Sequence, residues 1–154
     1  DAEAVIANWE AIKREEKGEQ EGYLLDYEYR ETSSLQTAYN YQKGAAKVGF
    51  DWPNVDDAWD KFVEEMAEFK KEIADGSDKT RVDEFGDVLF TLVNVARFYK
   101  VSPEEAMLHA NEKFKRRFNH VEDRVVQSAK AFKDFSLEEL DAFWDEAKRI
   151  EKGE

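Results

Sequence analysis

The sequence predicts an all-α protein, specifically a helical bundle, and three observations support this fold class. Only 7 Gly and 2 Pro occur in 154 residues, which leaves few of the turn signals that a many-stranded β protein needs. Hydrophobic residues recur at helical spacing in successive segments. Several of these segments also open with residues that cap helix N-termini.

Length and charge limit the possible functions. The chain is short enough for a single domain over residues 1–154, and its net charge of −13 argues against binding to nucleic acid polymers or to anionic membranes. The absence of cysteine excludes disulfides and thiolate metal sites and fits a reducing compartment such as the cytoplasm. No apolar run is long enough to span a bilayer. Because the first residue is Asp rather than Met, we expect the chain to be processed or excised from a longer protein.

The first third of the chain predicts two helices. Residues 3–17 carry apolar side chains at helical spacing and form the first. Residues 19–32 have no clear period, so we expect an irregular connector there. Ser33 or Ser34 then caps a second helix that runs to about Val48.

A third helix, over residues 55–75, follows a loop at residues 49–54. Pro53 lies in this loop at the expected start of the helix. The helix has one broad apolar stripe, and Gly76 with Ser77 provides good chemistry for its end.

Three further helices complete the bundle. The fourth spans about residues 79–99, and its centre, 88–96, is apolar nearly all round, which predicts a buried helix. The fifth begins at Pro103 and runs to about Lys130. A capping box at residues 136–140 opens the last helix.

Two short acidic motifs stand on the third and fourth helices. Glu65 and Glu68 are three residues apart and therefore share one helix face, and Glu84 and Asp87 repeat this spacing. The chain between the two motifs is long enough for the helices to fold back antiparallel. We therefore expect these carboxylates, together with the neighbouring Glu64, to converge.

Such a cluster is costly unless it is neutralised. Like charges repel along a helix, and in a cleft they must be paired or bound to a metal. Carboxylate oxygens favour Mg²⁺, with Mn²⁺ as a possible substitute. Asp87 and Asn94 are also polar groups on a helix predicted to be buried, and Gly86 costs about 1 kcal/mol in a helix, which suggests close helix packing there. The alternative is a solvated acidic face.

Basic residues gather on the fifth helix. Lys113 and Arg117 are four residues apart, and Phe114 and Phe118 are expected to anchor an adjacent strip in the core. This pair could contact the anionic oxygens of a substrate. Surface salt bridges are the alternative. His109 and His120 are expected at the surface or in packing rather than in a metal cluster.

Together these motifs resemble the MazG-type nucleoside triphosphate pyrophosphohydrolases of the all-α NTP pyrophosphatase superfamily, in their catalytic, C-terminal type of domain. The segments that carry the resemblance are KGAAKVGFDWP (43–53), Glu64-Glu65-x-x-Glu68, Glu84-Phe85-Gly86-Asp87 leading into VLFTLVNVAR, and ANEKFKRRF (110–118). The resemblance implies a helical bundle completed by dimerisation to a homodimer. It also implies hydrolysis of nucleoside triphosphates at the α–β phosphoanhydride, which gives a monophosphate and pyrophosphate.

The resemblance also assigns residue roles. The matching Mg²⁺ ligands are Glu65, Glu68, Glu84 and Asp87, with Glu64 as an accessory or general-base candidate. The matching phosphate contacts are Lys113 and Arg117, with Arg116 beside them. Asn94 matches a pocket asparagine of the family. Lys47 and Trp52 lie where they could reach the nucleotide end of the substrate, although Trp52 could equally be a wedge in the loop or at a dimer seam.

Two departures leave alternatives open. The run at residues 25–30 lacks the proline-containing stretch of many relatives, and Asn40 stands where a lysine is common, so the preferred base is not defined. A narrower enzyme for dUTP or a modified nucleotide is one alternative. A non-catalytic helical dimerisation or regulatory module is the other, although both acidic motifs and the basic pair are intact.

Overall fold

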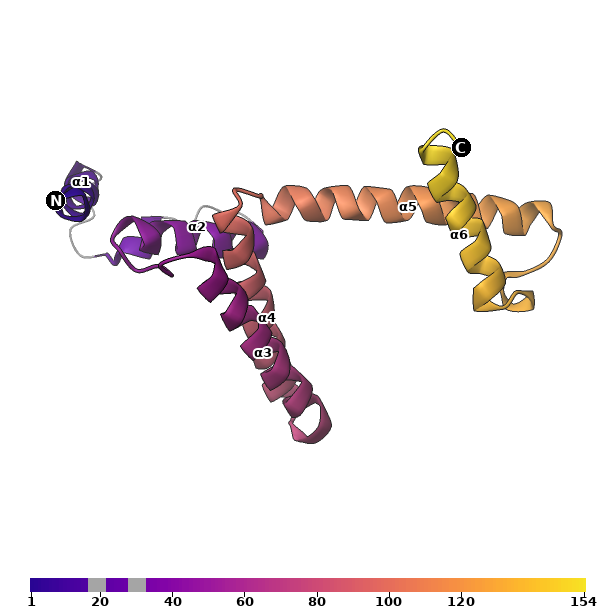
Figure 1. The fold of residues 1–154 in the computed structure, drawn as a ribbon, viewed down its shortest axis with the longest axis horizontal. Helices are drawn as coiled ribbons and strands as arrows, with labels where there is room; N and C mark the ends of the chain where they lie inside the picture. Colours follow the sequence, from indigo (N-terminus) through magenta and orange to yellow (C-terminus); the bar gives the residue numbers. More distant parts are fainter. Residues whose placement is uncertain (17–21, 28–32) are drawn as a thin grey trace. The chain divides into compact units, whose positions relative to one another are not determined.

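The computed structural model describes residues 1–16, 22–27 and 33–154, and within these ranges it contains helices and no strand. This confirms the predicted all-α fold class. The helices, labelled in Figure 1, are α1 (Ala2–Glu16), η1 (Leu24–Tyr27), α2 (Ser34–Lys47), α3 (Val55–Asp75), α4 (Asp78–Phe98), α5 (Pro103–Gln127), η2 (Phe132–Asp134) and α6 (Leu137–Glu151). Of the connector expected at 19–32, one 3-10 turn is described, and residues 19–21 and 28–32 lie outside the described residues.

The chain divides into two compact units, Asp1–Glu104 and Glu105–Glu154. The first contains α1 to α4 and the second contains nearly all of α5 together with α6. Within the described ranges, each helix is too short or too polar to cross a membrane.

Side-chain caps define most of the helix starts. Ser33 caps α2 by accepting a hydrogen bond from the backbone N–H of Gln36, and Ser136 forms the predicted capping box with Glu139. α3 is capped by Asn54, so Pro53 precedes the cap instead of opening the helix as expected.

The turn between α3 and α4 uses its two residues differently. Gly76 follows the last residue of α3, and its N–H donates to the carbonyl of Glu72. Ser77 is the N-cap of α4 and accepts from the N–H of Thr80. The two long helices therefore form a tight antiparallel hairpin (Figure 1).

α5 ends at Gln127 rather than near Lys130, because Ala129 adopts a left-handed backbone with φ 59°.

The core of the first unit lies where α4 packs against α3 and α2. Ala58 of α3 and Val93 and Val95 of α4 are buried there. Further along the hairpin, the rings of Phe69 and Phe85 pack with their centroids 5.2 Å apart.

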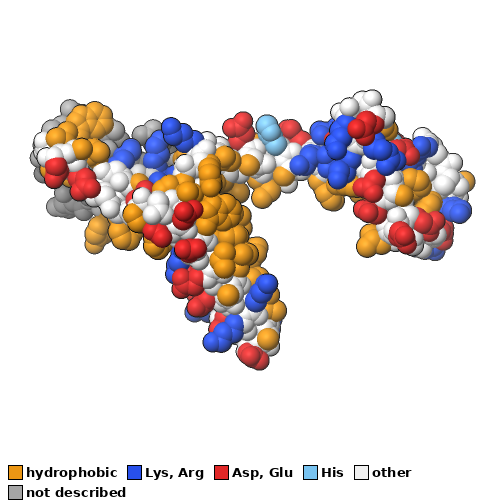
Figure 2. Space-filling view, in the orientation of Figure 1, with side chains coloured by type: hydrophobic (Ala, Val, Ile, Leu, Met, Phe, Trp, Pro, Cys, Tyr) orange, Lys and Arg blue, Asp and Glu red, His pale blue; other side chains and the backbone are white. Residues whose placement is uncertain are grey.

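The prediction that the centre of α4 is buried all round is wrong for this chain taken alone. Leu89, Phe90 and Leu92 are 38%, 45% and 43% exposed, because α3 and α2 cover only part of the helix. Figure 2 shows hydrophobic side chains gathered along one side of the hairpin. The predicted close approach at Gly86 is also wrong within the described residues, since a Cβ placed there would meet nothing within 4 Å.

The second unit is a smaller packing of α5 on α6. Val121, Val125 and Ala147 form its buried centre. The ring of Phe114 lies 5.4 Å from that of Trp144. Phe114 and Phe118 nevertheless remain 61% and 39% exposed, so the expected core strip is only partly covered.

Candidate functional site

Three carboxylates converge on the α3–α4 hairpin. Glu65 of α3 and Glu84 and Asp87 of α4 each offer an oxygen, and these oxygens all lie within 4.8 Å of one another. The antiparallel hairpin explains this arrangement, because i,i+3 spacing puts Glu84 and Asp87 on one face of α4. A set of three carboxylate oxygens fits a hard divalent cation, for which Mg²⁺ and Mn²⁺ are the usual choices.

Two carboxyls of this cluster have raised pKa values. The pKa of Glu84 is raised by desolvation, and the charges that raise it further are those of Glu68, Asp87, Glu65 and Glu72. The pKa of Asp87 is also raised by desolvation, and then by the negative charge of Glu65 and Asp83. The hairpin therefore holds more negative charge than its own residues neutralise at this point, and a bound cation would relieve it.

Lys61, which the sequence reasoning missed, supplies some compensating charge. Its Nζ lies 3.0 Å from Oε1 of Glu65 and 3.5 Å from Oε1 of Glu64. The hydrogen bond to Glu65 is the main reason that the pKa of Lys61 is raised. The i,i+4 spacing of Lys61 and Glu65 is a sequence signal that could have identified this pair.

The remaining predicted acids lie at the edge of the cluster. Glu68 is not part of the set whose oxygens lie within 4.8 Å, yet its charge still raises the pKa of Glu84. Glu64 has 59% of its side chain exposed and contacts Lys61. The structure thus brings together three of the four expected metal ligands.

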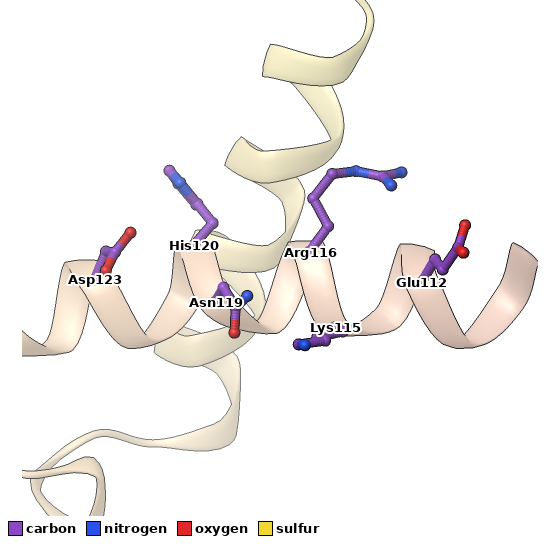
Figure 3. Close-up of a pocket in the computed structure, with 6 residues that line it drawn as sticks. All are labelled: Glu112, Lys115, Arg116, Asn119, His120 and Asp123. Carbon is purple, nitrogen blue, oxygen red and sulfur yellow. The ribbon is translucent and has the colours of Figure 1, made fainter.

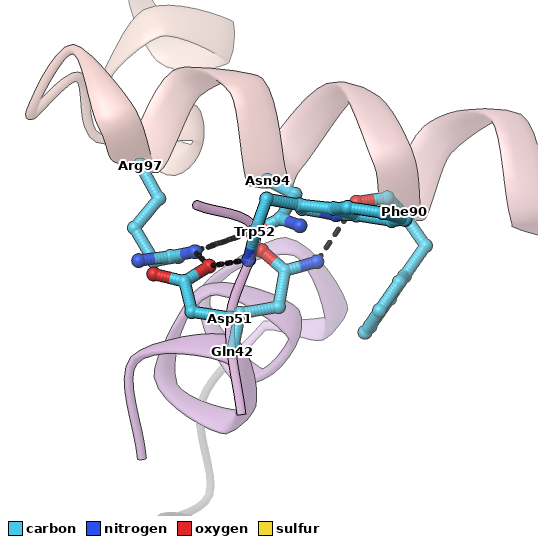
Figure 4. Close-up of polar contacts among 6 residues, drawn as sticks. All are labelled: Gln42, Asp51, Trp52, Phe90, Asn94 and Arg97. Atoms are coloured by element: carbon cyan, nitrogen blue, oxygen red, sulfur yellow. Dashed lines mark hydrogen bonds and ion pairs between the residues drawn. The ribbon is translucent and has the colours of Figure 1, made fainter. Parts of the chain in front are cut away.

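Asn94 and Trp52 belong to a polar network between α4 and the loop that precedes α3 (Figure 4). The Arg97 guanidinium donates to Asn94 Oδ1 from Nη2 at 2.8 Å and from Nε at 3.1 Å, and it also pairs with the Asp51 carboxylate. Asp51 in turn accepts a hydrogen bond from the backbone N–H of Trp52 at 2.8 Å. The network holds this loop against α4 and leaves the Trp52 side chain 39% exposed.

Arg97 and Asp51 were not predicted. Spacing could have linked Arg97 to Asn94, three residues earlier on the same helix face, whereas the contact with Asp51 depends on the tertiary fold. Gln42 was also missed. It is 7% exposed, and its Nε2 donates to the carbonyl of Phe90 at 2.8 Å, which ties α2 to α4. Lys47 lies in the last turn of α2 and is partly buried.

The predicted basic residues lie on α5, and two of them pair with α6. Oxygens of the Glu151 carboxylate lie 2.9 Å from Arg116 Nε and 3.0 Å from Arg117 Nη2. These hydrogen bonds lower the pKa of Glu151 to about 2. Both arginines therefore form salt bridges to a nearby Glu, which was the alternative to phosphate contact in the sequence analysis. Lys113 is exposed one turn before Arg117.

A shallow hollow of about 370 Å³ follows one face of α5 (Figure 3). Six α5 residues line it, namely Glu112, Lys115, Arg116, Asn119, His120 and Asp123. His120 Nε2 lies 2.9 Å from Oε1 of Glu146, and His109 is exposed beside Glu105. Both histidines therefore have the surface or packing role expected for them. Because the hollow is lined by one helix and mixes both signs of charge, the acidic cluster remains the better candidate for chemistry.

Carboxylates that converge from neighbouring helices are typical of one class of protein, the helical bundles that build metal sites from side chains on facing helices. Comparison with known proteins gives a similarity to one particular family. Residues 58–122, less than half of the chain, match the MazG nucleotide pyrophosphohydrolase domain. The matched segment includes both acidic motifs and the basic residues of α5.

Three relatives extend the similarity to most of the chain. The uncharacterized protein YabN of Bacillus subtilis (strain 168) is 47% identical over 153 residues, which cover 99% of this chain and 31% of that protein. The nucleoside triphosphate pyrophosphohydrolase/pyrophosphatase MazG of Thermotoga maritima is 34% identical over 141 residues, with coverages of 91% and 54%. The nucleoside triphosphate pyrophosphohydrolase of Escherichia coli (strain K12) is 37% identical over 152 residues, with coverages of 96% and 57%. The chain thus spans between about a third and somewhat more than half of the length of these relatives.

Proposed function

We propose that this chain hydrolyses nucleoside triphosphates at the α–β phosphoanhydride, giving a nucleoside monophosphate and pyrophosphate. The observation that carries the proposal is the convergence of Glu65, Glu84 and Asp87 oxygens within 4.8 Å, inside the segment that matches the MazG domain. Relatives from Thermotoga maritima and Escherichia coli that are named for this activity support it.

The proposed cofactor is Mg²⁺, with Mn²⁺ as a substitute. Glu65, Glu84 and Asp87 would hold the ion, and Glu68 would be the fourth ligand because its charge already acts on Glu84. When bound, such an ion neutralises the triphosphate and polarises its oxygens. The raised pKa values of Glu84 and Asp87 are consistent with this role, since a bound cation would offset the repulsion among neighbouring carboxylates that helps to raise them.

The chemistry asks two things of the protein. A carboxylate in or beside the cluster accepts a proton from the attacking water. The water oxygen bonds to phosphorus, and the bridging P–O bond between the α- and β-phosphates breaks. Glu64, exposed and hydrogen-bonded to Lys61, is one candidate for this base. On α5, Lys113 and Arg117, with Arg116 beside them, are proposed to stabilise the charge that develops on the phosphoryl oxygens.

The nucleoside end is proposed to involve Trp52, Asn94 and Lys47. The Trp52 indole is 39% exposed on a loop that the Asp51–Arg97 pair holds in place, so a base could stack on it at little ordering cost. Asn94 Oδ1 accepts a hydrogen bond from Arg97, which fixes the orientation of the Asn94 side chain. Its amide NH2 group would then be available to donate in one direction.

We also propose that a second copy of the chain covers the exposed side of α4. Phe85, Leu89, Phe90 and Leu92 are each between 38% and 47% exposed, and a continuous apolar helix face of this kind is usually buried against a partner. Sedimentation equilibrium should give a dimer mass for the wild-type protein and a monomer mass for Leu89→Glu. A monomeric wild type would contradict this part of the proposal.

The proposed location is the cytoplasm. A chain without cysteine forms no disulfides, so its folding does not depend on an oxidising compartment.

The activity is tested by measuring release of monophosphate and pyrophosphate from each triphosphate, with and without Mg²⁺. We expect Mg²⁺-dependent release by the wild type and loss of it in Glu68→Ala and Asp87→Ala. Glu146→Gln serves as the control, because Glu146 pairs with Arg124 and His120 in the second unit. Wild-type rates in either alanine variant would refute the site. A panel that includes dUTP and modified triphosphates would reveal a narrower specificity.

A further inference from the structure

Glu151, near the end of α6, receives hydrogen bonds from two arginines of α5. Arg116 Nε donates to its Oε1 at 2.9 Å. Arg117 donates to its Oε2 from Nε at 3.1 Å and from Nη2 at 3.0 Å. The side chains of Arg117 and Glu151 are only 17% and 25% exposed, so this contact is partly shielded from water.

The contact places an anion on the groups proposed to bind phosphate. A guanidinium presents a planar fork of donors that matches the oxygens of a carboxylate and those of a phosphate equally well. The same Nε and Nη2 donors of Arg117 therefore cannot serve Glu151 and a phosphoryl group at once. The pKa of Glu151, lowered to about 2 by these bonds, means that the carboxylate is ionised throughout the neutral range.

We propose that Glu151 is an internal anion that sets the affinity and selectivity of Arg116 and Arg117 for phosphate, and that a triphosphate displaces it on binding. This inference rests on the proposed function. A triphosphate has more charge and more acceptor oxygens than one carboxylate and can replace it. A nucleoside monophosphate has fewer of both and replaces it less readily, so Glu151 favours substrate over product.

The chain contains a matched control for this contact. Glu146 lies on the same helix and also receives bonds from α5, with its Oε1 2.7 Å from Arg124 Nε and 2.9 Å from His120 Nε2. Glu146→Gln therefore removes an α5–α6 ion pair of the same kind without touching Arg116 or Arg117.

The experiment compares Glu151→Gln and Glu146→Gln in the full 154-residue chain. We expect Glu151→Gln to lower KM for the triphosphate by about two- to fivefold at nearly unchanged kcat, as loss of one partly exposed competing ion pair would do. Product inhibition by the monophosphate should tighten by at least the same factor. Glu146→Gln should leave both constants unchanged. An unchanged or raised KM in Glu151→Gln, or equal effects of the two variants, would overturn the proposal.

Binding of inorganic tripolyphosphate, measured by calorimetry without Mg²⁺, separates this inference from the proposed function. Tighter binding by Glu151→Gln than by the wild type supports the inference even if the wild type hydrolyses no triphosphate, a result that would refute only the proposed function. Equal or weaker binding refutes the inference. If Glu151→Gln does not fold, Glu151→Asp replaces it, because Asp retains the charge with a shorter reach. Tighter tripolyphosphate binding by Glu151→Asp than by the wild type is then the supporting result, and equal or weaker binding refutes the inference.

Discussion

Carboxylates in the two units of this protein have opposite environments. On the α3–α4 hairpin, the pKa values of Glu84 and Asp87 are raised by desolvation and by neighbouring acids. On α6, hydrogen bonds from α5 lower the pKa values of Glu146 and Glu151. The residue type is the same in both places, and the difference lies in what each carboxylate faces.

This difference separates carboxylates that are paired with arginines inside their own unit from carboxylates that a bound cation would stabilise. The α6 carboxylates face arginines, so the α5–α6 packing neutralises its own charge. The hairpin carboxylates face each other, which costs stability unless a cation joins them. The arrangement of acidic charge is therefore more informative about function than the net charge of −13.

The largest expected effect is on catalysis. Asp87→Ala should lower the rate of Mg²⁺-dependent triphosphate hydrolysis by at least about 100-fold, since changes one shell further from a metal already cost 10–100-fold. Glu146→Gln should change the rate by less than about twofold, as expected for a surface ion pair. Steady-state assays of both variants test the comparison, and similar losses in the two would contradict it.

Metal binding should appear next, as a change in thermal stability. At 100 times its Kd, Mg²⁺ adds about 2.7 kcal/mol to the free energy of unfolding, which corresponds to roughly 5–10 °C in Tm for a domain of this size. Calorimetric melting should show this shift in the wild type and in Glu146→Gln. The double variant Glu84→Gln/Asp87→Asn should show none, and a retained shift would place the ion elsewhere.

A smaller effect concerns the pH dependence of the stability that the Glu151 ion pair contributes. The pKa of Glu151 is about 2 in the folded protein against 4.5 as its ordinary value, so its contribution to stability is complete above about pH 4.5 and is lost as the pH falls towards 2. Glu151→Gln should therefore be less stable than the wild type at neutral pH, and the two should converge in acid. Urea unfolding at several pH values measures this, and a difference that persists unchanged to pH 2 would rule out the ion pair as its source.

The smallest effect concerns Gly86, between Glu84 and Asp87 on α4. Because an added Cβ would meet nothing within 4 Å in the described chain, Gly86→Ala should stabilise the protein by about 0.5–1 kcal/mol through helix propensity. Urea unfolding tests this. A destabilised variant would show that another surface, such as a second copy, approaches the helix here.

Local sequence chemistry predicted much of the fold. Ser33 and Ser136 cap helices as expected, and i,i+3 spacing correctly predicted that Glu84 and Asp87 share a face. These features depend on residues a few positions apart, which is the range over which capping and helical periodicity act.

Features that depend on tertiary packing were harder to predict. Apolar periodicity indicates that α4 needs cover but does not specify what covers it, so the exposure of Leu89 and Phe90 was missed. The contact of Arg97 with Asp51 joins residues far apart in sequence and could not be found from spacing alone. The pairing of Lys61 with Glu65 is different, because these residues are four positions apart on one helix and the i,i+4 rule alone indicates it.

The short turn at Gly76 and Ser77 also has a consequence for folding kinetics. It joins α3 directly to α4, so all three carboxylates of the cluster come from one continuous stretch between residues 65 and 87. Contacts between residues so near in sequence require little loop-closure entropy and form early in folding. The hairpin can therefore bring its carboxylates together before any contact distant in sequence has formed, and a divalent cation present at that time would stabilise the nascent hairpin.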